Sequence, residues 1–308
     1  MEVIEDIDNF ANEGLALTIG FFDGLHAGHR YLIDEISNIA KEEGLKSAVF
    51  TFWPHPRIVL NDRYKPKLLN TKEEKLEQLS ATQLDYCVMT EFTMKLADMS
   101  AYDFMKFLRE KLNVRHLVVG YDHRFGRNRE EGFEDYRTYG EELGMKVTQA
   151  DPYTDNKYTI SSSFIRQLLA VGEVNMANHY LGYPYSFGGT IVDGNKIGRT
   201  LGYPTANIKL DADNKMLPKI GVYAVLVETN GARYKAMMYI GTRPTAQMGD
   251  ETSIEVCLFN FDGDLYGKKM TVYIIDHVRN EHKFENMDAL KEQLRKDKQM
   301  VLSMLRLY

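Results

Sequence analysis

The sequence predicts two domains of different fold class, an open α/β domain with a parallel sheet and then an antiparallel β-barrel that ends in a helix. The chain has 308 residues, which is the upper edge of what one hydrophobic core supports. Strand-like and helix-like segments alternate as far as Gly182, and short strand-like runs then follow until Ile275. The change of pattern indicates a change of domain.

The N-terminal segments form β-α-β units. The expected strands cover 16–20, 47–52, 86–89 and 116–119, and the expected helices lie around 28–40, 76–84 and 100–108. Ser100, with Asp103 three residues later, is typical of a capped helix start. Repeated β-α-β connections of this length require a parallel sheet that helices cover, so this half is an open, doubly wound α/β domain.

The C-terminal segments form about six strands. Clear examples are Phe187–Val192, Val222–Glu228, Tyr234–Ile240, Ser253–Phe259 and Met270–Ile275. Turn dipeptides are expected at Gly188-Gly189, Asp193-Gly194, Asn230-Gly231 and Asp262-Gly263. A closed or nearly closed antiparallel barrel protects the edges of so many short strands. An amphipathic helix with Asn286 as its N-cap ends the chain. The two domains are expected at 1–182 and 183–308.

The composition limits the partners and the compartment. A formal net charge of −6 argues against nucleic acid, which is bound by clustered Lys and Arg. Cys87 and Cys257 lie far apart and have no metal-ligand spacing, so a reducing compartment is expected, with both thiols buried. The acidic N-terminus does not resemble a signal peptide, and no apolar stretch approaches the roughly 20 residues of a membrane helix. We expect a cytoplasmic protein with no membrane partner and no obligate protein partner.

The first strand passes into the first helix through a segment that favours phosphate binding. His26 and His29 lie three residues apart on the incoming turn, and Gly24 and Gly28 allow close approach of the backbone. A helix N-terminus at the carboxyl end of a parallel strand offers free N–H groups to an anion. The alternative is two surface histidines near a tight turn.

A second segment, 198–208, contains glycines around a turn and then Thr205 and Asn207 two residues apart. On a strand these two side chains point to one face, where both can offer an oxygen to Mg²⁺. Without further context it is simply a Gly/Pro turn that enters a strand. Glu255 alternates with apolar neighbours and faces away from them, which is also typical of a solvent-facing strand residue.

Four N-terminal motifs resemble those of bacterial bifunctional riboflavin kinase/FMN adenylyltransferases, whose first domain is a Rossmann-like nucleotidyltransferase. They are Phe22-Asp23-Gly24-Leu25-His26-Ala27-Gly28-His29-Arg30 and the segments 51–57, 119–127 and 160–166. The chain departs from the usual family pattern at Phe21 (usually Asn), Trp53 (usually Asp), His123 (usually Phe) and Ser163 (usually Thr).

The C-terminal half resembles the riboflavin kinase domain of the same family, a six-stranded barrel. The signature is Gly198-Arg199-Thr200-Leu201-Gly202-Tyr203-Pro204-Thr205-Ala206-Asn207, and the segments 221–224, 240–245, 253–256, 262–267 and 278–284 agree with it. The resemblance implies that ATP phosphorylates riboflavin to FMN, with Glu255 as general base, and then adenylylates FMN to FAD. It also implies Mg²⁺, with riboflavin, FMN and ATP as the ligands.

The resemblance also assigns site residues. The catalytic residues that it implies are Glu255, His26 and His29. The residues that it implies for binding ATP and phosphate are Gly20, Phe22, Gly28, Ser162, Arg166, Gly198, Gly202, Thr205 and Asn207, and the last two are also implied as metal ligands. The flavin-binding residues that it implies are Asp122 and Arg279. Elsewhere, the sequence predicts that Lys72–Lys75 is a solvated helix face.

Three other interpretations compete with this one. A nucleotidyltransferase whose barrel only senses flavin would have lost the kinase residues, yet Thr205, Asn207 and Glu255 are present. A fragment of a class I tRNA synthetase would need a Lys-Met-Ser-Lys-Ser-like loop and a basic surface, and the sequence has neither. A purely structural pair of domains disagrees with two phosphate-site signatures.

Overall fold

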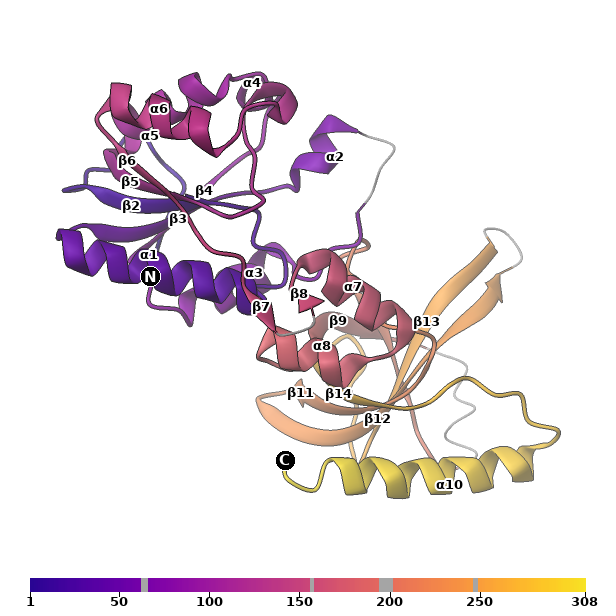
Figure 1. Ribbon diagram of the computed structural model, residues 1–308. Coiled ribbons are helices and arrows are strands. Elements are labelled where there is room, and N and C mark those ends of the chain that lie inside the picture. Colours follow the sequence, from indigo (N-terminus) through magenta and orange to yellow (C-terminus); the bar gives the residue numbers. More distant parts are fainter. Residues whose placement is uncertain (62–65, 156–157, 194–201, 246–248) are drawn as a thin grey trace. The chain divides into compact units, whose positions relative to one another are not determined.

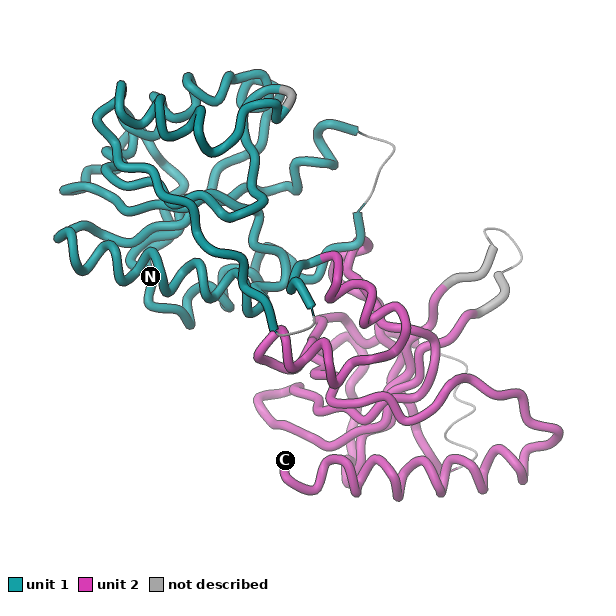
Figure 2. The backbone as a smooth tube through the Cα atoms, viewed as in Figure 1, with its two compact units in different colours: residues 1–162 teal, residues 163–308 magenta. Residues whose placement is uncertain are grey.

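A computed structural model describes the chain except for residues 62–65, 156–157, 194–201 and 246–248 (Figure 1). It divides into two compact units, Met1–Ser162 and Ser163–Tyr308 (Figure 2). This division falls about 20 residues before the predicted domain boundary, so the segment up to Leu181 belongs to the second unit. Gly198, a predicted phosphate-binding residue, lies outside the described residues.

The first unit contains a six-stranded sheet in which every neighbouring pair is parallel, and the predicted α/β class is confirmed. Its strand order is β1-β4-β3-β2-β5-β6. The strands are β1 (Glu2–Ile4), β2 (Leu15–Ile19), β3 (Lys46–Phe52), β4 (Tyr86–Thr90), β5 (Val114–Val119) and β6 (Lys146–Gln149). The sequence analysis did not find the two edge strands, β1 and β6.

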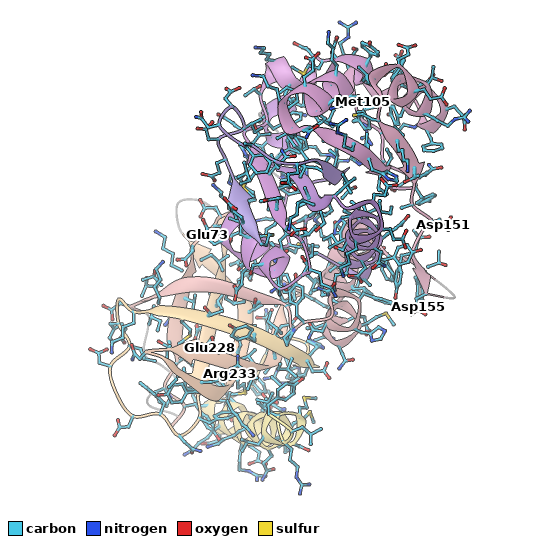
Figure 3. All side chains as sticks on the ribbon, turned by 90° about the vertical axis from the view of Figure 1, so that its left-hand side faces the viewer. Glu73, Met105, Asp151, Asp155, Glu228 and Arg233 are labelled. Atoms are coloured by element: carbon cyan, nitrogen blue, oxygen red, sulfur yellow. The ribbon has the colours of Figure 1, made fainter. Side chains whose placement is uncertain are left out.

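Helices cover both faces of this sheet (Figure 1). They are α1 (Ala27–Glu43), α2 (Pro56–Leu60), α3 (Lys72–Ser80), α4 (Met94–Ala97), α5 (Ala101–Leu112) and α6 (Phe133–Leu143), with η1 (Arg127–Arg129), β7 (Thr154–Asp155) and β8 (Tyr158–Thr159) between or after them. Ser100 caps α5 by accepting a hydrogen bond from the Asp103 N–H at 3.1 Å, as predicted. Met105, which Figure 3 labels on α5, is fully buried in the core.

The second unit is a closed six-stranded barrel, which confirms the predicted fold class. The strands follow one another around it as β10-β13-β12-β11-β14-β9, all antiparallel. They are β9 (Ser186–Val192), β10 (Ala206–Leu210), β11 (Gly221–Thr229), β12 (Ala232–Thr245), β13 (Gly249–Leu258) and β14 (Lys269–Arg279). The unit also contains α8 (Val174–Leu181), α10 (Met287–Met304) and all of α7 (Ser162–Val171) after its first residue.

Local chemistry explains the ends of several elements. Asn230 and Gly231 both have positive φ, as a two-residue hairpin requires, and they join β11 to β12 as predicted. Glu228 and Arg233 pair beside this turn at 2.6 Å (Figure 3). Asn286 caps α10 by accepting from the Ala289 N–H at 2.9 Å, also as predicted.

The predicted turn at Gly188-Gly189 is wrong, because both glycines lie inside β9. A Cβ on Gly189 would lie 2.6 Å from the Lys209 carbonyl oxygen of β10. Here glycine permits two backbones to approach closely rather than to turn.

One amide ties α8 to the barrel. The Asn178 Nδ2 atom donates to the carbonyl oxygens of Ile274 and Ile275 at 2.9 and 3.3 Å, and its Oδ1 atom accepts from the Tyr185 N–H at 2.7 Å. Four residues of α8 are buried, namely Val174, Ala177, Tyr180 and Leu181. The helix is therefore part of the barrel's own packing.

These contacts predict that a fragment of residues 163–308 is more stable than one of residues 183–308. The shorter fragment loses the Asn178 bonds and the buried side chains of α8, which together contribute at least about 2 kcal/mol. Urea unfolding followed by circular dichroism measures the difference. Equal midpoints for the two fragments would show that α7 and α8 do not stabilise the barrel.

Candidate active sites

The loop after β2 is built by close approach of its own residues. The Gly20 N–H donates to the Phe50 carbonyl oxygen at 3.0 Å, and Phe22 is buried with φ +55°. A Cβ on Gly20 would come within 3.0 Å of the Phe22 ring. The chain therefore turns sharply at the carboxyl end of β2 and delivers His26 to the start of α1 as its N-cap.

His26 and His29 form a stacked pair at this helix start. Their ring centroids are 3.7 Å apart with 19° between the planes, and the His29 and Phe22 rings form a T-shaped contact with centroids 5.2 Å apart. A Cβ on Gly28 would lie 3.3 Å from the His26 ring, so glycine leaves room for the stack. The side chain of His26 makes no capping hydrogen bond to the first N–H groups of α1. These groups and the two imidazoles can together surround an anion.

Burial keeps one of these imidazoles neutral. Desolvation places the pKa of His29 well below its usual range, and the nearby charges of His26, Arg30, Lys75 and His123 lower it further. The buried Nδ1 atom of His29 has no hydrogen-bond partner within the described part of the chain. A neutral ring can donate one hydrogen bond and accept another, so this atom can bind a substrate atom without carrying a charge.

A buried carboxylate holds the loop in place. Asp23 accepts hydrogen bonds from the backbone N–H groups of Leu69 and Asn70 at 2.9 and 3.1 Å. The Asn70 side chain accepts from the Gly24 N–H at 2.7 Å, and the Ser162 hydroxyl donates to the Asp23 carbonyl oxygen at 2.9 Å. Ser162, one of the predicted phosphate-binding residues, therefore contacts the histidine loop at Asp23.

The other predicted residues of this half lie as follows. Arg166 follows Ser162 by one turn of α7 and is half-buried. Asp122 is exposed in the loop after β5, and β5 neighbours β2, so both loops leave the same edge of the sheet. His123, next to Asp122, was not predicted as a site residue. Its Nε2 atom is buried without a partner among the described residues, and burial lowers its pKa to about 4.

The prediction of a solvated face for Lys72–Lys75 is wrong at Lys75, which is 1% exposed. Its ammonium donates to the Phe21 and Phe52 carbonyl oxygens and to the Thr51 hydroxyl. Lys75 precedes Leu79 by one helical turn and thus shares its buried face. The four-residue spacing from Leu79 could have predicted from the sequence that Lys75 is buried.

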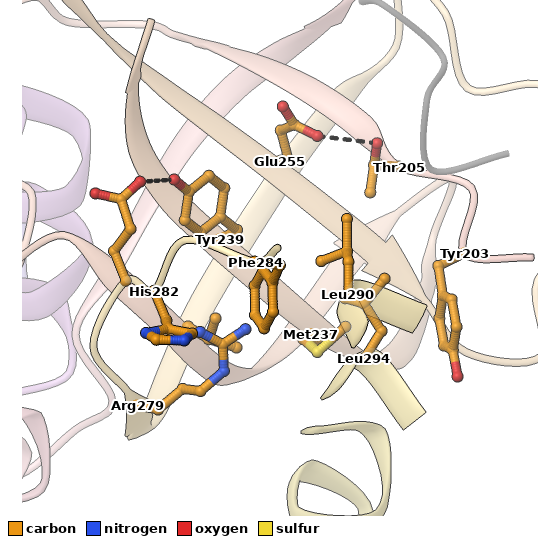
Figure 4. A pocket seen from close by; sticks show the side chains of 12 residues that line it. Tyr203, Thr205, Met237, Tyr239, Glu255, Arg279, His282, Phe284, Leu290 and Leu294 are labelled. Carbon is orange, nitrogen blue, oxygen red and sulfur yellow. Dashed lines mark hydrogen bonds between the residues drawn. The ribbon is translucent and has the colours of Figure 1, made fainter. Parts of the chain in front are cut away.

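The barrel has a pocket of about 330 Å³ on its outer face (Figure 4). Much of its lining is apolar, with several convergent polar groups. The lining residues are Tyr203, Thr205, Val222, Met237, Tyr239, Glu255, Arg279, Glu281, His282, Phe284, Leu290 and Leu294. A pocket of this size and character is typical of small-molecule sites.

Strand register places the polar residues in one row. Asn207 lies opposite Glu255, Glu255 opposite Tyr239, Tyr239 opposite Val222, and Val222 opposite Arg279, across five strands. Directly opposed residues share a face of the sheet. Ile254 and Val256 are buried on the other face, so Glu255 points away from them as predicted.

Within this pocket, Thr205 and Glu255 touch. The Thr205 hydroxyl donates to the Glu255 Oε2 atom at 3.2 Å (Figure 4). Glu255 is half-buried rather than solvent-facing, and Asn207 is buried beside it. Gly202, two residues before Pro204, has φ +82° and makes the turn that leads to this pair. Three of the predicted residues thus lie on one face.

Arg279 lines the pocket, and an ion pair with Asp297 fixes the position of its guanidinium. Its guanidinium donates to both carboxylate oxygens of Asp297 at 2.8 to 3.0 Å, and Gln293 donates to the same carboxylate. Asp297 is buried on α10. At the far side of the pocket, the Tyr239 hydroxyl donates to Glu281, and burial is the main cause that raises the pKa of Tyr239. The sequence analysis found neither Asp297 nor Tyr239.

We predict that Asp297→Ala destabilises the barrel unit by about 2–4 kcal/mol, because the partly buried guanidinium loses its carboxylate. Gln293→Ala removes only one hydrogen bond to that carboxylate and should cost about 1–2 kcal/mol. Urea unfolding followed by circular dichroism measures both. The single tryptophan, Trp53, lies in the other unit, so its fluorescence separates the two transitions. Equal losses in the two variants would contradict a stabilising role for the ion pair.

Comparisons with known proteins identify the family. A family model described as FAD synthetase matches residues 8–164, and one described as riboflavin kinase matches residues 181–305. The bifunctional riboflavin kinase/FMN adenylyltransferase of Listeria monocytogenes is 36% identical over 293 residues, 95% of this chain and 93% of the relative. The protein of the same name in Bacillus subtilis is 37% identical over 288 residues, 92% and 90% of the two chains.

A solved structure agrees over the whole chain. A macrolide-efflux protein from Streptococcus pneumoniae has a TM-score of 0.87 and 32% identity, covering 97% of both chains. Among the described helices, none is both long enough and apolar enough to cross a membrane. Two family models in the expected order and relatives that match over nine-tenths of their length lead to one conclusion. The chain belongs to the bifunctional riboflavin kinase/FMN adenylyltransferase family.

Proposed function

We propose that the two sites catalyse consecutive steps, each in its own unit. The barrel pocket phosphorylates riboflavin to FMN, and the histidine site transfers an adenylyl group from ATP to FMN, giving FAD and pyrophosphate. ATP is the co-substrate of both steps. The observation that carries the proposal is the contact of Thr205 with Glu255 inside a pocket large enough for a ring system, in a chain of this family.

In the kinase step Glu255 acts as general base. The riboflavin 5′-hydroxyl is a poor nucleophile at neutral pH, so a carboxylate within hydrogen-bond reach assists it. The hydroxyl oxygen attacks the γ-phosphorus of ATP, its proton passes to Glu255, and ADP leaves. The apolar side chains of Tyr203, Met237 and Phe284 provide a surface for the flavin ring, with Arg279 at its edge.

The residues of the kinase site also fit a magnesium ion. Thr205, just before β10, and Asn207, in β10, offer a hydroxyl and an amide oxygen beside Glu255, and both are hard donors of the kind that Mg²⁺ prefers. The described residues contain no group of three or more acidic, histidine or cysteine side chains arranged to hold a metal ion, and Mg²⁺ usually binds through few side chains, water and phosphate. A bound ion would neutralise charge on the phosphate oxygens. Gly198 and Gly202 are proposed to bring the backbone close to those phosphates.

In the adenylyl-transfer step the protein positions the reactants and stabilises charge. A phosphate oxygen of FMN attacks the α-phosphorus of ATP in line, and pyrophosphate leaves without a covalent protein intermediate. His26 and His29 hydrogen-bond the phosphoryl oxygens as their charge grows, helped by the N–H groups of α1. Gly20, Phe22 and Gly28 shape the phosphate loop, Ser162 and Arg166 hold the β and γ phosphates, and Asp122 contacts the flavin.

Incubation with riboflavin, ATP and Mg²⁺, followed by chromatography of the flavins, tests the whole scheme. FMN should appear first and FAD second. Unchanged riboflavin together with FAD formed from supplied FMN would favour a flavin-sensing barrel instead.

We also propose a cytoplasmic location, because the two cysteines are buried and free, as is usual in a reducing compartment.

We predict that His29→Ala slows FAD formation from FMN by roughly a hundredfold or more, because a donor to the transition-state phosphate is lost. Riboflavin phosphorylation should not change, since that site belongs to the other unit. Both rates are measured on the same sample by chromatography. Equal loss of both activities in a folded variant would contradict the assignment of the two reactions to separate units.

We predict that Glu255→Gln lowers the turnover of riboflavin phosphorylation by about a hundredfold or more, because an amide cannot accept the hydroxyl proton. The substitution keeps the size of the side chain and can still accept from Thr205, so folding and FMN adenylylation should survive. Thr205→Val is the matched variant, and it should chiefly raise the KM for ATP–Mg²⁺. Near-normal FMN production by Glu255→Gln would show that Glu255 is not the base.

A further inference from the structure

Lys75 is a buried cation whose hydrogen-bond acceptors are all uncharged, while the Asp23 carboxylate acts on it only through its nearby charge. It is 1% exposed, and no carboxylate of the described residues forms an ion pair with it. Burying a charge without a direct ion pair costs several kcal/mol in general. Burial accordingly lowers the pKa of Lys75 to about 8. A chain that only had to fill this space could do so with methionine or leucine.

The ammonium joins the ends of two neighbouring parallel strands. Its three N–H groups donate to the Phe21 carbonyl oxygen at 3.1 Å, the Phe52 carbonyl oxygen at 3.0 Å and the Thr51 hydroxyl at 3.2 Å. The last paired residues of β2 and β3 are Ile19 and Phe50, so these contacts lie beyond the β2–β3 ladder, where Thr51 and Phe52 pair only with β4. Three donors match three acceptors, which a shorter or uncharged side chain cannot do as well.

Each of the two strand ends leads into one wall of the candidate site. Phe21 precedes Phe22 in the loop that carries His26 and His29, and Phe52 precedes the segment Trp53–His55. The Lys75 ammonium also lies 4.0 Å from the Phe21 ring centroid and 5.2 Å from that of Trp53. The His55 ring in turn meets the Phe21 ring at 4.3 Å. One side chain therefore holds the two segments at a fixed separation.

The charge also acts on the histidine pair. Lys75 is one of the cations that lower the pKa of His29, although the two residues come from different helices. A positive charge that is sealed from water keeps its effect on a nearby phosphate, whereas a solvated one is screened. The buried charge therefore acts on the histidine site, an effect that packing of the fold alone does not require.

We propose that Lys75 is a positioning residue for adenylyl transfer, which fixes the histidine loop relative to the Trp53–His55 segment and adds positive charge beneath the phosphate site. It touches no reacting atom and acts through Phe21, Phe52 and His29. The inference rests on the proposed adenylyl transfer at this site. A wild-type protein that makes no FAD refutes that function, whereas an active wild type with an unaffected Lys75 variant refutes only the inference.

The test is Lys75→Met, which keeps the length of the side chain and removes its charge and its three hydrogen bonds. FAD formation from FMN should fall about tenfold or more, mainly in kcat, because the donors to the transition state are displaced. Unfolding of this unit, followed by Trp53 fluorescence, should shift to equal or higher urea concentration, since replacing a buried charge by an apolar group often stabilises. Riboflavin phosphorylation in the same sample should be unchanged.

Two further measurements separate this role from a merely structural one. In Lys75→Met the pKa of His29, measured by NMR of labelled imidazole, should rise because a neighbouring charge is gone. Lys72→Met on the same helix is the matched control; Lys72 pairs with Glu5 at 2.7 Å on the surface, and its loss should alter neither FAD formation nor that pKa. Lys75→Gln, smaller and uncharged, replaces Lys75→Met if the latter does not fold, with the same loss expected. FAD formation within twofold of wild type in either folded variant, or an unchanged His29 pKa, overturns the proposal.

Discussion

Strand register is the constraint on which both candidate sites depend. In the barrel, the antiparallel ladders bring Asn207, Glu255, Tyr239, Val222 and Arg279 into one row, although they are scattered over 73 positions of the chain from 207 to 279. Because side chains alternate between faces, a slip of one residue in any ladder would move a member of this row to the inner face. Burial of Ile254 and Val256 inside the barrel opposes such a slip.

In the parallel sheet of the first unit, the common direction of the strands, rather than the alternation of side chains, brings the site segments together. All its strands point the same way, so the segments that follow β2, β3 and β5 leave one edge together. Two buried charges then organise that edge in different ways. The Asp23 carboxylate is satisfied by backbone N–H groups, and the Lys75 ammonium by carbonyl oxygens and a hydroxyl. Each ties the loops to the sheet through hydrogen bonds to uncharged groups.

The two proposed sites differ in their electrostatics in a way that suits the two proposed reactions. Deprotonation of the substrate hydroxyl needs a proton acceptor. The pocket contains the half-buried Glu255 carboxylate, which accepts a hydrogen bond from the Thr205 hydroxyl. Adenylyl transfer needs donors to growing negative charge rather than a strong base. The stacked histidine pair, with the pKa of His29 held low by burial, is suited to hydrogen bonding without an exchange of protons. One chain can therefore run both reactions only if their sites have separate surroundings.

Much of this arrangement could be predicted from the sequence, because it depends on local rules. Periodicity identified the central strands of the parallel sheet and the barrel, and turn chemistry identified the hairpin at Asn230-Gly231. The two-residue spacing of Thr205 and Asn207 implied a shared face before any partner was known. The short motifs around His26, His29 and Glu255 then indicated the family.

Other features were decided only by tertiary structure, because they depend on what lies opposite a residue. Gly188-Gly189 has the composition of a turn, but close approach of β10 makes it part of a strand. Lys75 lies in a run of charged residues, and only the ends of β2 and β3 show why that position is buried. Asp297 becomes a partner of Arg279 because α10 covers the outer face of the barrel. A sequence pattern records the period of a helix or strand, but the partner across the interface comes from the fold.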